Sequence, residues 1–243
     1  MIRSGLSDVP QISTDLYHEI VDFADGTPEP VRWLAGHFTE WSIILLGALL
    51  VVAAAPRLGA GPRRLALALA APVAVVLAYG ASELLKSLVD EDRPCRTPAD
   101  LVIIAGHCPP AGDWSFPSNH STIAGALAAV ILLLSPRLAW YAVPLAVLAA
   151  LSRTFVGVHY PHDVVAGLLL GALVGTVGTP LLARPVAELL RRRDRRADRP
   201  LQLKGRAPSW RFRHRKLPFS HPPPAPGRGS TAQAADEHGA GRG

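Results

Sequence analysis

Aromatic residues, charges and sulfur are all scarce in this chain. Only 6% of the 243 residues are aromatic and 18% are charged, whereas 49% are hydrophobic, a balance too apolar for an ordinary soluble domain. The apolar residues are mainly Ala, Leu and Val, and they are concentrated between Trp41 and Ala183. This clustering predicts segments that lie in a lipid bilayer.

Five apolar runs, nearly free of charge, predict five hydrophobic helices. They are Trp41–Ala55, Leu65–Leu85, Ile123–Leu134, Leu138–Leu151 and Val164–Ala183. Only the second and the fifth reach the roughly 20 residues that cross a bilayer core unaided. The third can begin at Asn119 and the fourth can run to Phe155, so we expect an all-α integral membrane bundle with about five transmembrane helices spanning residues 41–183. Buried helices of a soluble core are the alternative, but such runs leave no amphipathic outer face.

No cleavable signal peptide is expected, because the first apolar run comes late and no short basic leader precedes it. Residues 1–40 are predicted to be an extracytoplasmic region with an interfacial helix. Its apolar residues recur at helical spacing, at Ile12, Leu16, Ile20 and Phe23. Pro28 and Pro30 should divide this region into two pieces, and residues 34–38 are apolar enough to extend the first crossing.

Positive charge is scarce at the start of the chain and abundant at its end. Residues 1–40 hold two Arg and seven acidic residues, whereas 15 of the 25 Lys and Arg residues, against five acidic ones, lie from Arg184 onward. Because basic flanks stay in the cytoplasm, residues 184–243 are predicted to be a basic, largely disordered cytoplasmic tail that suits anionic lipids better than nucleic acid. Five crossings then place segments 86–117 and 152–163 outside, in a multi-pass protein of the cell membrane.

The two cysteines, Cys95 and Cys108, both lie in the first of these outer segments. An oxidising exterior would permit a disulfide between them, worth about 3 kcal/mol against the unfolded loop, and two unpaired thiols are the alternative. No His or acidic residue joins them at zinc-ligand spacing, so no metal site is expected.

Three short motifs hold the chemically active residues of the outer segments. The first, K-x6-RP, runs from Lys86 to Pro94, and two helical turns would place Lys86 and Arg93 on one helix face. The second, PS-x-H, contains Ser118 as a candidate N-cap and His120 in the first helical turn, where unpaired N–H groups favour an anion. Taken singly, both motifs favour a simpler interpretation: the basic residues of the first as membrane anchors, and His120 of the second as a surface histidine without a function.

The third motif, SR-x5-H-x3-D, runs from Ser152 to Asp163. Arg153 can contact two phosphate oxygens at once. His159 and Asp163 are four residues apart, so a helix from about Tyr160 would let the carboxylate orient the imidazole and leave its other nitrogen free to attack. His162 is expected to point elsewhere on this helix and to take no part.

Together the motifs resemble those of the type 2 phosphatidic acid phosphatase (PAP2) superfamily, which also includes soluble vanadium haloperoxidases and bacterial acid phosphatases. The resemblance covers about Gly80 to Gly171, and every charged position of the pattern is filled. The one departure is Asn119, where the family usually has Gly. Its backbone N–H would still be able to bind phosphate.

The resemblance implies a role for each motif residue. His159 would be the nucleophile that forms a phosphohistidine, Asp163 would orient it, and His120 would protonate the leaving oxygen and then activate water. The phosphoryl oxygens would be held by Lys86, Arg93, Ser118, Asn119 and Arg153, with no metal or cofactor.

The function implied is a membrane lipid phosphatase. Our first choice of substrate is a polyprenyl diphosphate such as undecaprenyl diphosphate, and phosphatidic acid and phosphatidylglycerol phosphate are the alternatives. A haloperoxidase is disfavoured by the membrane spans, and a non-catalytic lipid-binding protein is disfavoured because no His or Arg of the motifs is replaced. The sequence predicts no oligomeric state.

Overall fold

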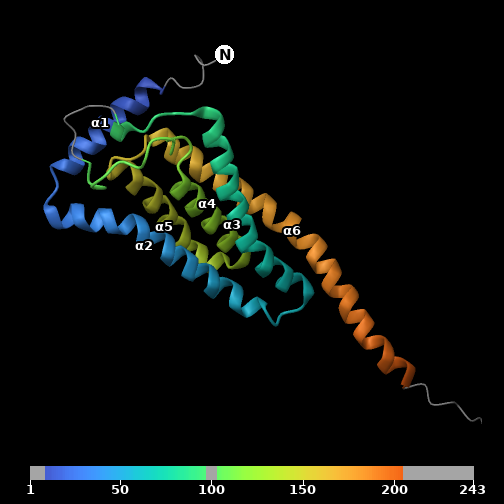
Figure 1. Cartoon of the computed structure of the whole chain (residues 1–243). Helices are drawn as coiled ribbons and strands as arrows, with labels where there is room; N and C mark the ends of the chain where they lie inside the picture. Colours follow the sequence, from blue (N-terminus) through green and yellow to red (C-terminus); the bar gives the residue numbers. More distant parts are fainter. Residues whose placement is uncertain (1–8, 97–102, 205–243) are drawn as a thin grey trace, which may run out of the picture.

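The computed structural model describes residues 9–96 and 103–204, with side chains as far as Arg195, and this part of the chain is built of helices and loops (Figure 1). The α-helices are α1 (Gln11–Asp25), α2 (Glu29–Ala54), α3 (Pro62–Val89), α4 (Asn119–Leu134), α5 (Pro136–Phe155) and α6 (Pro161–Lys204). Two 3-10 segments, η1 (Ala55–Arg57) and η2 (Pro94–Arg96), follow α2 and α3. The predicted all-α fold is confirmed.

Four helical stretches are long and apolar enough to cross a membrane: Glu29–Arg57, Pro62–Val89, Pro136–Phe155 and Pro161–Arg195. α4 has 16 residues and begins at Asn119, and α5 ends at Phe155, as the sequence predicted. Because α4 is shorter than a bilayer core is thick, five complete crossings stay a prediction. Large apolar side chains cover the outside of the bundle, among them Leu45, Val51, Val76, Leu77, Trp140, Leu169 and Leu173. Such a surface suits lipid as its solvent.

α4 is the central helix of the bundle and packs against α2, α3, α5 and α6 (Figure 1). Its sequence is apolar all round, so it has no face that favours contact with solvent. Ile131 and Leu134 are completely buried, together with Leu46 of α2 and Ala74 of α3. The far end of α4 is thereby packed against α2 and α3.

Small residues let α4 and α6 approach each other closely. A Cβ added to Gly171 of α6 would overlap the carbonyl of Thr122, and one added to Gly125 of α4 would overlap the carbonyl of Leu168. Interfaces of this kind are common where membrane helices pack without a hydrophobic driving force. The approach continues to the starts of both helices, where Ser118 N donates to the carbonyl of Asp163 at 3.1 Å.

The N-terminal region divides as Pro28 and Pro30 predicted, with α1 ending at Asp25 and α2 beginning at Glu29. Proline is tolerated in the first turn of a helix, because the N–H that it lacks would have no helical partner there. α2 then runs through residue 40 without interruption, so residues 34–38 do extend the first apolar helix. α1 packs against α5 and α6.

The segment after Ala183 differs from the expectation at its start, because α6 continues to Lys204. This part of the sequence is rich in Ala, Leu, Glu and Arg, which favour helix, and Glu188 accepts from Arg192 Nε at 3.1 Å one turn later. The predicted disorder of residues 205–243 falls outside the described residues.

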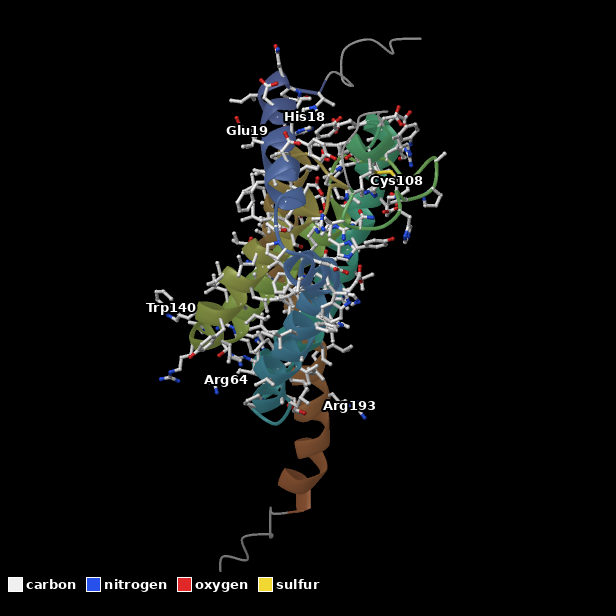
Figure 2. The ribbon with its side chains drawn as sticks, turned by 90° about the vertical axis from the view of Figure 1, so that its left-hand side faces the viewer. His18, Glu19, Arg64, Cys108, Trp140 and Arg193 are labelled. Carbon is white, nitrogen blue, oxygen red and sulfur yellow. A yellow bond between two sulfur atoms is a disulfide. The ribbon has the colours of Figure 1, made fainter. Side chains whose placement is uncertain are left out.

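The two ends of the bundle differ in chemistry. In Figure 2, His18 and Glu19 of α1 and Cys108 lie toward one end, and Arg64, Trp140 and Arg193 lie toward the other. Cys95 and Cys108 form the predicted disulfide, with their Cα atoms 5.7 Å apart. All three sequence motifs lie at the disulfide end, at the last turns of α3 and α5 and the first turns of α4 and α6.

Candidate active site

The three motifs, which are far apart in the sequence, meet at one end of the bundle. Lys86 comes from the last turns of α3, Arg93 from the loop that follows, and Ser118 from the residue before α4. His159 lies in the short loop between α5 and α6, and Asp163 in the first turn of α6. All five are buried, which is costly for polar and charged groups unless they are paired.

Two features hold the loop that carries His159. Gly157 has φ of 84°, a left-handed conformation that glycine adopts without strain. The carbonyl of Gly157 accepts from Tyr17 Oη of α1 at 3.0 Å. Pro161 then begins α6, so that Asp163 faces back toward the imidazole.

His159 and Asp163 form the predicted pair, with 3.3 Å between Nδ1 and Oδ2. The same Oδ2 accepts from the backbone N–H of Tyr160 at 2.8 Å and from the hydroxyl of Ser115. On the other side of the ring, Arg93 Nη1 lies 2.9 Å from Nε2. A guanidinium can only donate, so Nε2 must accept and the ring proton belongs on Nδ1. The network thus selects the tautomer that an attacking Nε2 requires.

His159 is also kept uncharged. Burial lowers its pKa to about 3, and the positive charges of Arg93 and Arg153 act in the same direction, against the opposing effect of Asp163. A neutral imidazole keeps its lone pair at physiological pH, which is the state of a nucleophile.

The two cations of the first motif converge, but the prediction that they share a helix face is wrong, because α3 ends at Val89 and Arg93 lies in the loop that follows. An acidic residue lies between them. Asp113 Oδ1 is 2.7 Å from Lys86 Nζ and 3.0 Å from Arg93 Nη2. Burial acts to raise the pKa of Asp113, but hydrogen bonds and charge from Lys86 and Arg93 outweigh it, so the pKa is lowered. An oxyanion is therefore held where these two cations converge.

Arg153 and Ser118 present polar atoms that lack partners. Arg153 Nη1 donates to Thr39 Oγ1 of α2 at 2.8 Å, whereas its Nε is buried without a hydrogen bond among the described residues. The same is true of Ser118 Oγ. Ser118 is the N-cap of α4 as predicted, but its side chain does not cap the helix. Both atoms can donate a hydrogen bond, so a bound anion would satisfy them.

His120 and Asn119 point to different neighbours in the first turn of α4. His120 Nε2 lies 3.1 Å from Glu40 Oε1 of α2. Asn119 accepts from Ser82 Oγ at 2.7 Å and donates to Glu83, both on α3. The Asn119 side chain is thus occupied by α3, which leaves its backbone N–H as the group that the sequence assigned to phosphate.

The expectation that His162 takes no part in the chemistry stays a prediction, although its side chain contacts residues of the site. Its Nε2 lies 3.3 Å from Asp163 Oδ1 and 3.1 Å from Glu91 Oε2, and its Nδ1 lies 2.8 Å from Ser13 Oγ of α1. These ligand-type atoms of Glu91, His162 and Asp163 all lie within 4.8 Å of one another. The hydrogen bond from His162 to Glu91 and the ion-pair distance to Asp163 account for this arrangement. Asp163 Oδ1 itself is buried and has no hydrogen-bond partner among the described residues.

Several residues of the site are not specified by the motifs: Thr39, Glu40, Asp113 and Ser115 lie outside them, and Glu91 is at a variable position of the first. The only sequence signal for Glu40 is a lone acid beside the first apolar run, and Asp113 and Ser115 lie in a loop without regular spacing. Their contacts join segments that are far apart in the chain, so local patterns do not reveal them.

Comparison with known proteins identifies the family of the chain. The model of the PAP2 superfamily matches residues 67–185. An undecaprenyl-diphosphatase of Sulfolobus acidocaldarius is 35% identical over 103 residues, which are 42% of this chain and about half (48%) of that protein. A decaprenylphosphoryl-5-phosphoribose phosphatase of Mycobacterium tuberculosis is 35% identical over 144 residues, 58% of this chain and 71% of that protein.

Among solved structures, LpxE of Aquifex aeolicus has the same fold, with a TM-score of 0.50 at 22% identity over 71% of this chain and 97% of that one. The matched family segment contains all three motifs, and one apolar helix long enough to cross a membrane, Glu29–Arg57, precedes it. The chain is a multi-pass membrane protein and belongs to the PAP2 superfamily.

Proposed function

We propose that this protein is a membrane phosphatase that removes a phosphate from a lipid phosphate or diphosphate through a phosphohistidine on His159. The observation that carries the proposal is the state of His159, which is neutral, buried and oriented by Asp163, with Nε2 directed at the cationic side of the site. A histidine held in this way among three cations suits attack on phosphorus.

In the first step, Nε2 of His159 forms a bond to phosphorus as the bond from phosphorus to the leaving oxygen breaks. Arg93 would transfer its hydrogen bond from Nε2 to a phosphoryl oxygen, and Asp113 would give up its place on Lys86 and Arg93 to the substrate. His120 supplies the proton that the leaving oxygen needs. In the second step, His120 takes a proton from water, and the water oxygen displaces His159 from phosphorus.

The cations Lys86, Arg93 and Arg153 would neutralise the charge on the phosphoryl oxygens in the transition state, with Ser118 and the amide of Asn119 as further donors. Asp163 would remain ionised and stabilise the positive charge that develops on His159. These residues supply each charge and proton that the two steps require.

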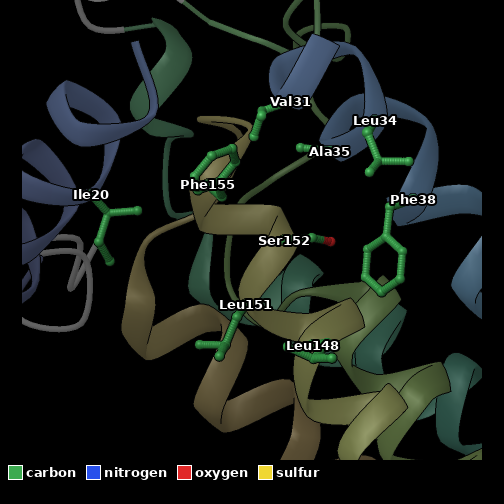
Figure 3. A pocket seen from close by; sticks show the side chains of 9 residues that line it. All are labelled: Ile20, Val31, Leu34, Ala35, Phe38, Leu148, Leu151, Ser152 and Phe155. Carbon is green, nitrogen blue, oxygen red and sulfur yellow. The ribbon is translucent and has the colours of Figure 1, made fainter. Parts of the chain in front are cut away.

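An apolar cavity beside the site supports a lipid as substrate. It has a volume of about 500 Å³ and opens among α1, α2 and α5 (Figure 3). Its walls are formed by Ile20, Val31, Leu34, Ala35, Phe38, Leu148, Leu151, Ser152 and Phe155. Phe38 and Ser152 directly precede Thr39 and Arg153, which are hydrogen-bonded to each other at 2.8 Å. A hydrocarbon chain would find an apolar surface one residue away from the phosphate site.

A polyprenyl-linked phosphate remains our first choice of substrate. Two of the similar proteins are named for such lipids, an undecaprenyl diphosphate in one case and a decaprenylphosphoryl-5-phosphoribose in the other. Phosphatidic acid and phosphatidylglycerol phosphate are the second choice. A non-catalytic lipid-binding protein would not need a neutral His159 or an acid at His120.

We further propose that the site faces the extracytoplasmic side and that the end of α6 is cytoplasmic. The Arg residues of the connection after α2 and of the end of α6 support this orientation, because basic flanks stay inside. The disulfide at the site end also suits an oxidising exterior. A reporter fused to the C-terminus should be cytoplasmic, and an external reporter would reverse the orientation.

The test is phosphate release by the purified protein from a panel of prenyl diphosphates, prenyl-linked sugar phosphates and glycerophospholipid phosphates. The wild type should hydrolyse at least one member and form an acid-labile phosphoenzyme when quenched during turnover. His159→Ala should abolish both signals. Hydrolysis of no member by wild type, or a phosphoenzyme in His159→Ala, would contradict the proposal.

A further inference from the structure

Two neighbouring residues of α2 reach into the site from outside the segment that defines the family. Thr39 Oγ1 accepts from Arg153 at 2.8 Å, and Glu40 Oε1 lies 3.1 Å from His120 Nε2. The family match begins at residue 67, so neither residue belongs to it. α2 thus contacts two functional residues of the site, one on α5 and one on α4.

We propose that Glu40 is the positioning residue of the acid His120, so that α2 completes the active site. The proposal rests on the function proposed above, because it concerns the proton that His120 delivers. Glu40 touches no reacting atom. It acts through the orientation and charge of the imidazole.

The contact between Glu40 and His120 determines which ring nitrogen of His120 can donate a proton to the substrate. A carboxylate can only accept, so Nε2 carries the proton that faces Glu40. The opposite nitrogen, Nδ1, then delivers a proton to the leaving oxygen when the ring is positively charged. The arrangement mirrors that of His159, in which a carboxylate holds one nitrogen and leaves the other for the substrate.

Charge gives Glu40 a second role. His120 is the acid only when it is protonated, and burial, followed by the charges of Arg153 and Arg93, opposes a positive ring and lowers the pKa of His120 to about 4. Glu40 is the carboxylate that faces His120 and offsets them. Because its side chain is 66% exposed, it can hold its charge without being dehydrated.

A purely structural contact between α2 and α4 is the competing explanation, and the leaving group separates the two. An alkoxide needs a proton from His120 as it departs, whereas 4-nitrophenolate departs without one. A positioning role therefore predicts a loss that depends on the substrate. A structural role predicts the same loss for every substrate.

The experiment compares Glu40→Gln with wild type in the same detergent, using kcat/KM for an alkyl lipid phosphate and for 4-nitrophenyl phosphate. For the alkyl lipid phosphate, kcat/KM should fall about 10- to 100-fold, since a general acid contributes roughly 10²- to 10⁴-fold. For 4-nitrophenyl phosphate, which needs no acid, it should fall by no more than about threefold. The alkaline limb of the alkyl-substrate profile should also move to lower pH. Glu29→Gln, the same change at the start of α2, is the matched control and should leave both values unchanged.

A double variant tests whether Glu40 acts through His120. Glu40→Gln added to His120→Ala should cause no further loss, because Glu40 acts only through His120. An unchanged alkyl value in Glu40→Gln, an equal loss on both substrates, or an additive loss in the double variant would overturn the proposal. A wild type that hydrolyses neither substrate would overturn the proposed function as well, whereas an active wild type with an unaffected Glu40→Gln overturns this proposal alone.

Discussion

The two histidines of the site are held by carboxylates in opposite surroundings. His159 has 2% of its side chain exposed and Asp163 has none, and the carboxylate is fixed further by Ser115 and the amide of Tyr160. His120 has 28% exposed, and its partner Glu40 has 66% exposed on another helix. The His159–Asp163 dyad is therefore buried, whereas the His120–Glu40 dyad is partly exposed and formed by two separate helices.

The difference matches the separate chemical roles proposed for the two rings. A nucleophile must keep its lone pair and its orientation. Burial keeps the lone pair, because it lowers the pKa of His159 to about 3, and Asp163 holds the orientation. An acid that becomes a base must release and take up protons within each turnover, so contact with water helps it. Disturbing the buried dyad should therefore be far more damaging than disturbing the open one.

The largest effect is expected from Asp163→Asn. The amide removes the negative charge that stabilises a protonated His159 and no longer enforces the tautomer with the proton on Nδ1. In the Ser-His-Asp triad the equivalent change lowers kcat about 10⁴-fold, and we expect a loss of about 10³-fold or more here. The measurement is kcat together with phosphoenzyme yield. Asp194→Asn on the far part of α6 serves as control, and activity within tenfold of wild type in Asp163→Asn would contradict the assignment.

The second largest effect is expected from disturbing the close contact between α4, which carries His120, and α6, which carries Asp163. Gly171→Val would press a branched side chain against the carbonyl of Thr122. Overpacking of this kind costs about 1–3 kcal/mol and should separate Ser118 and His120 from Asp163. We expect lower thermal stability and at least about tenfold lower activity.

Gly178→Val is the matched control for Gly171→Val, because a Cβ there would have only ordinary contacts. Equal stability of the two variants would show that the close approach of α4 and α6 does not limit the fold.

The sequence predicts the buried dyad better than the open one, and the reason is the distance along the chain. His159 and Asp163 are four residues apart, so helical spacing alone pairs them. Glu40 and His120 are separated by 80 positions, and only the packing of α2 against α4 brings them together. A local pattern contains no information about such a contact.

The contacts of His162 are hidden from the sequence for a related reason. A helical projection places its side chain away from His159, but it does not show the hydrogen bond from His162 to Glu91, which lies 71 residues earlier in the chain. The sequence does not predict the continuation of α6 past Ala183, because a run of charges is typical of disorder, although Arg and Glu also favour helix.

A smaller effect is expected from Asp113→Asn, which tests the anion site between the two dyads. The carboxylate competes with phosphate for Lys86 and Arg93, so its loss should tighten inhibition by inorganic phosphate about three- to tenfold at pH 7, roughly 1 kcal/mol. Asp113→Asn should also lower the stability of the fold. The pKa of Asp113 is lower in the folded protein than in the unfolded chain, so its carboxylate stabilises the fold above the unfolded pKa. This stabilisation is lost as the pH falls through the folded pKa.

The two proteins, wild type and Asp113→Asn, should therefore become alike in phosphate inhibition as the pH is lowered and Asp113 takes up a proton. Inhibition constants measured across the pH range check this sign. Weaker inhibition in the variant at pH 7 would mean that Asp113 assists phosphate binding instead of competing with it.

The smallest effect on catalysis is expected from removing the disulfide, which lies at the site end but touches neither dyad. Cys95→Ser with Cys108→Ser should lower the free energy of unfolding by about 3 kcal/mol, because the bond restricts the unfolded loop. Arg93 and Asp113 flank the bridged segment and are held by their own ion pair, so kcat should change by less than about threefold once the protein is folded. Thermal unfolding and kcat, each measured below the unfolding transition of the variant, separate the two quantities. A loss of activity as large as that of Asp163→Asn would instead mean that the bridge, and not the ion pairs, holds the cations of the site in place.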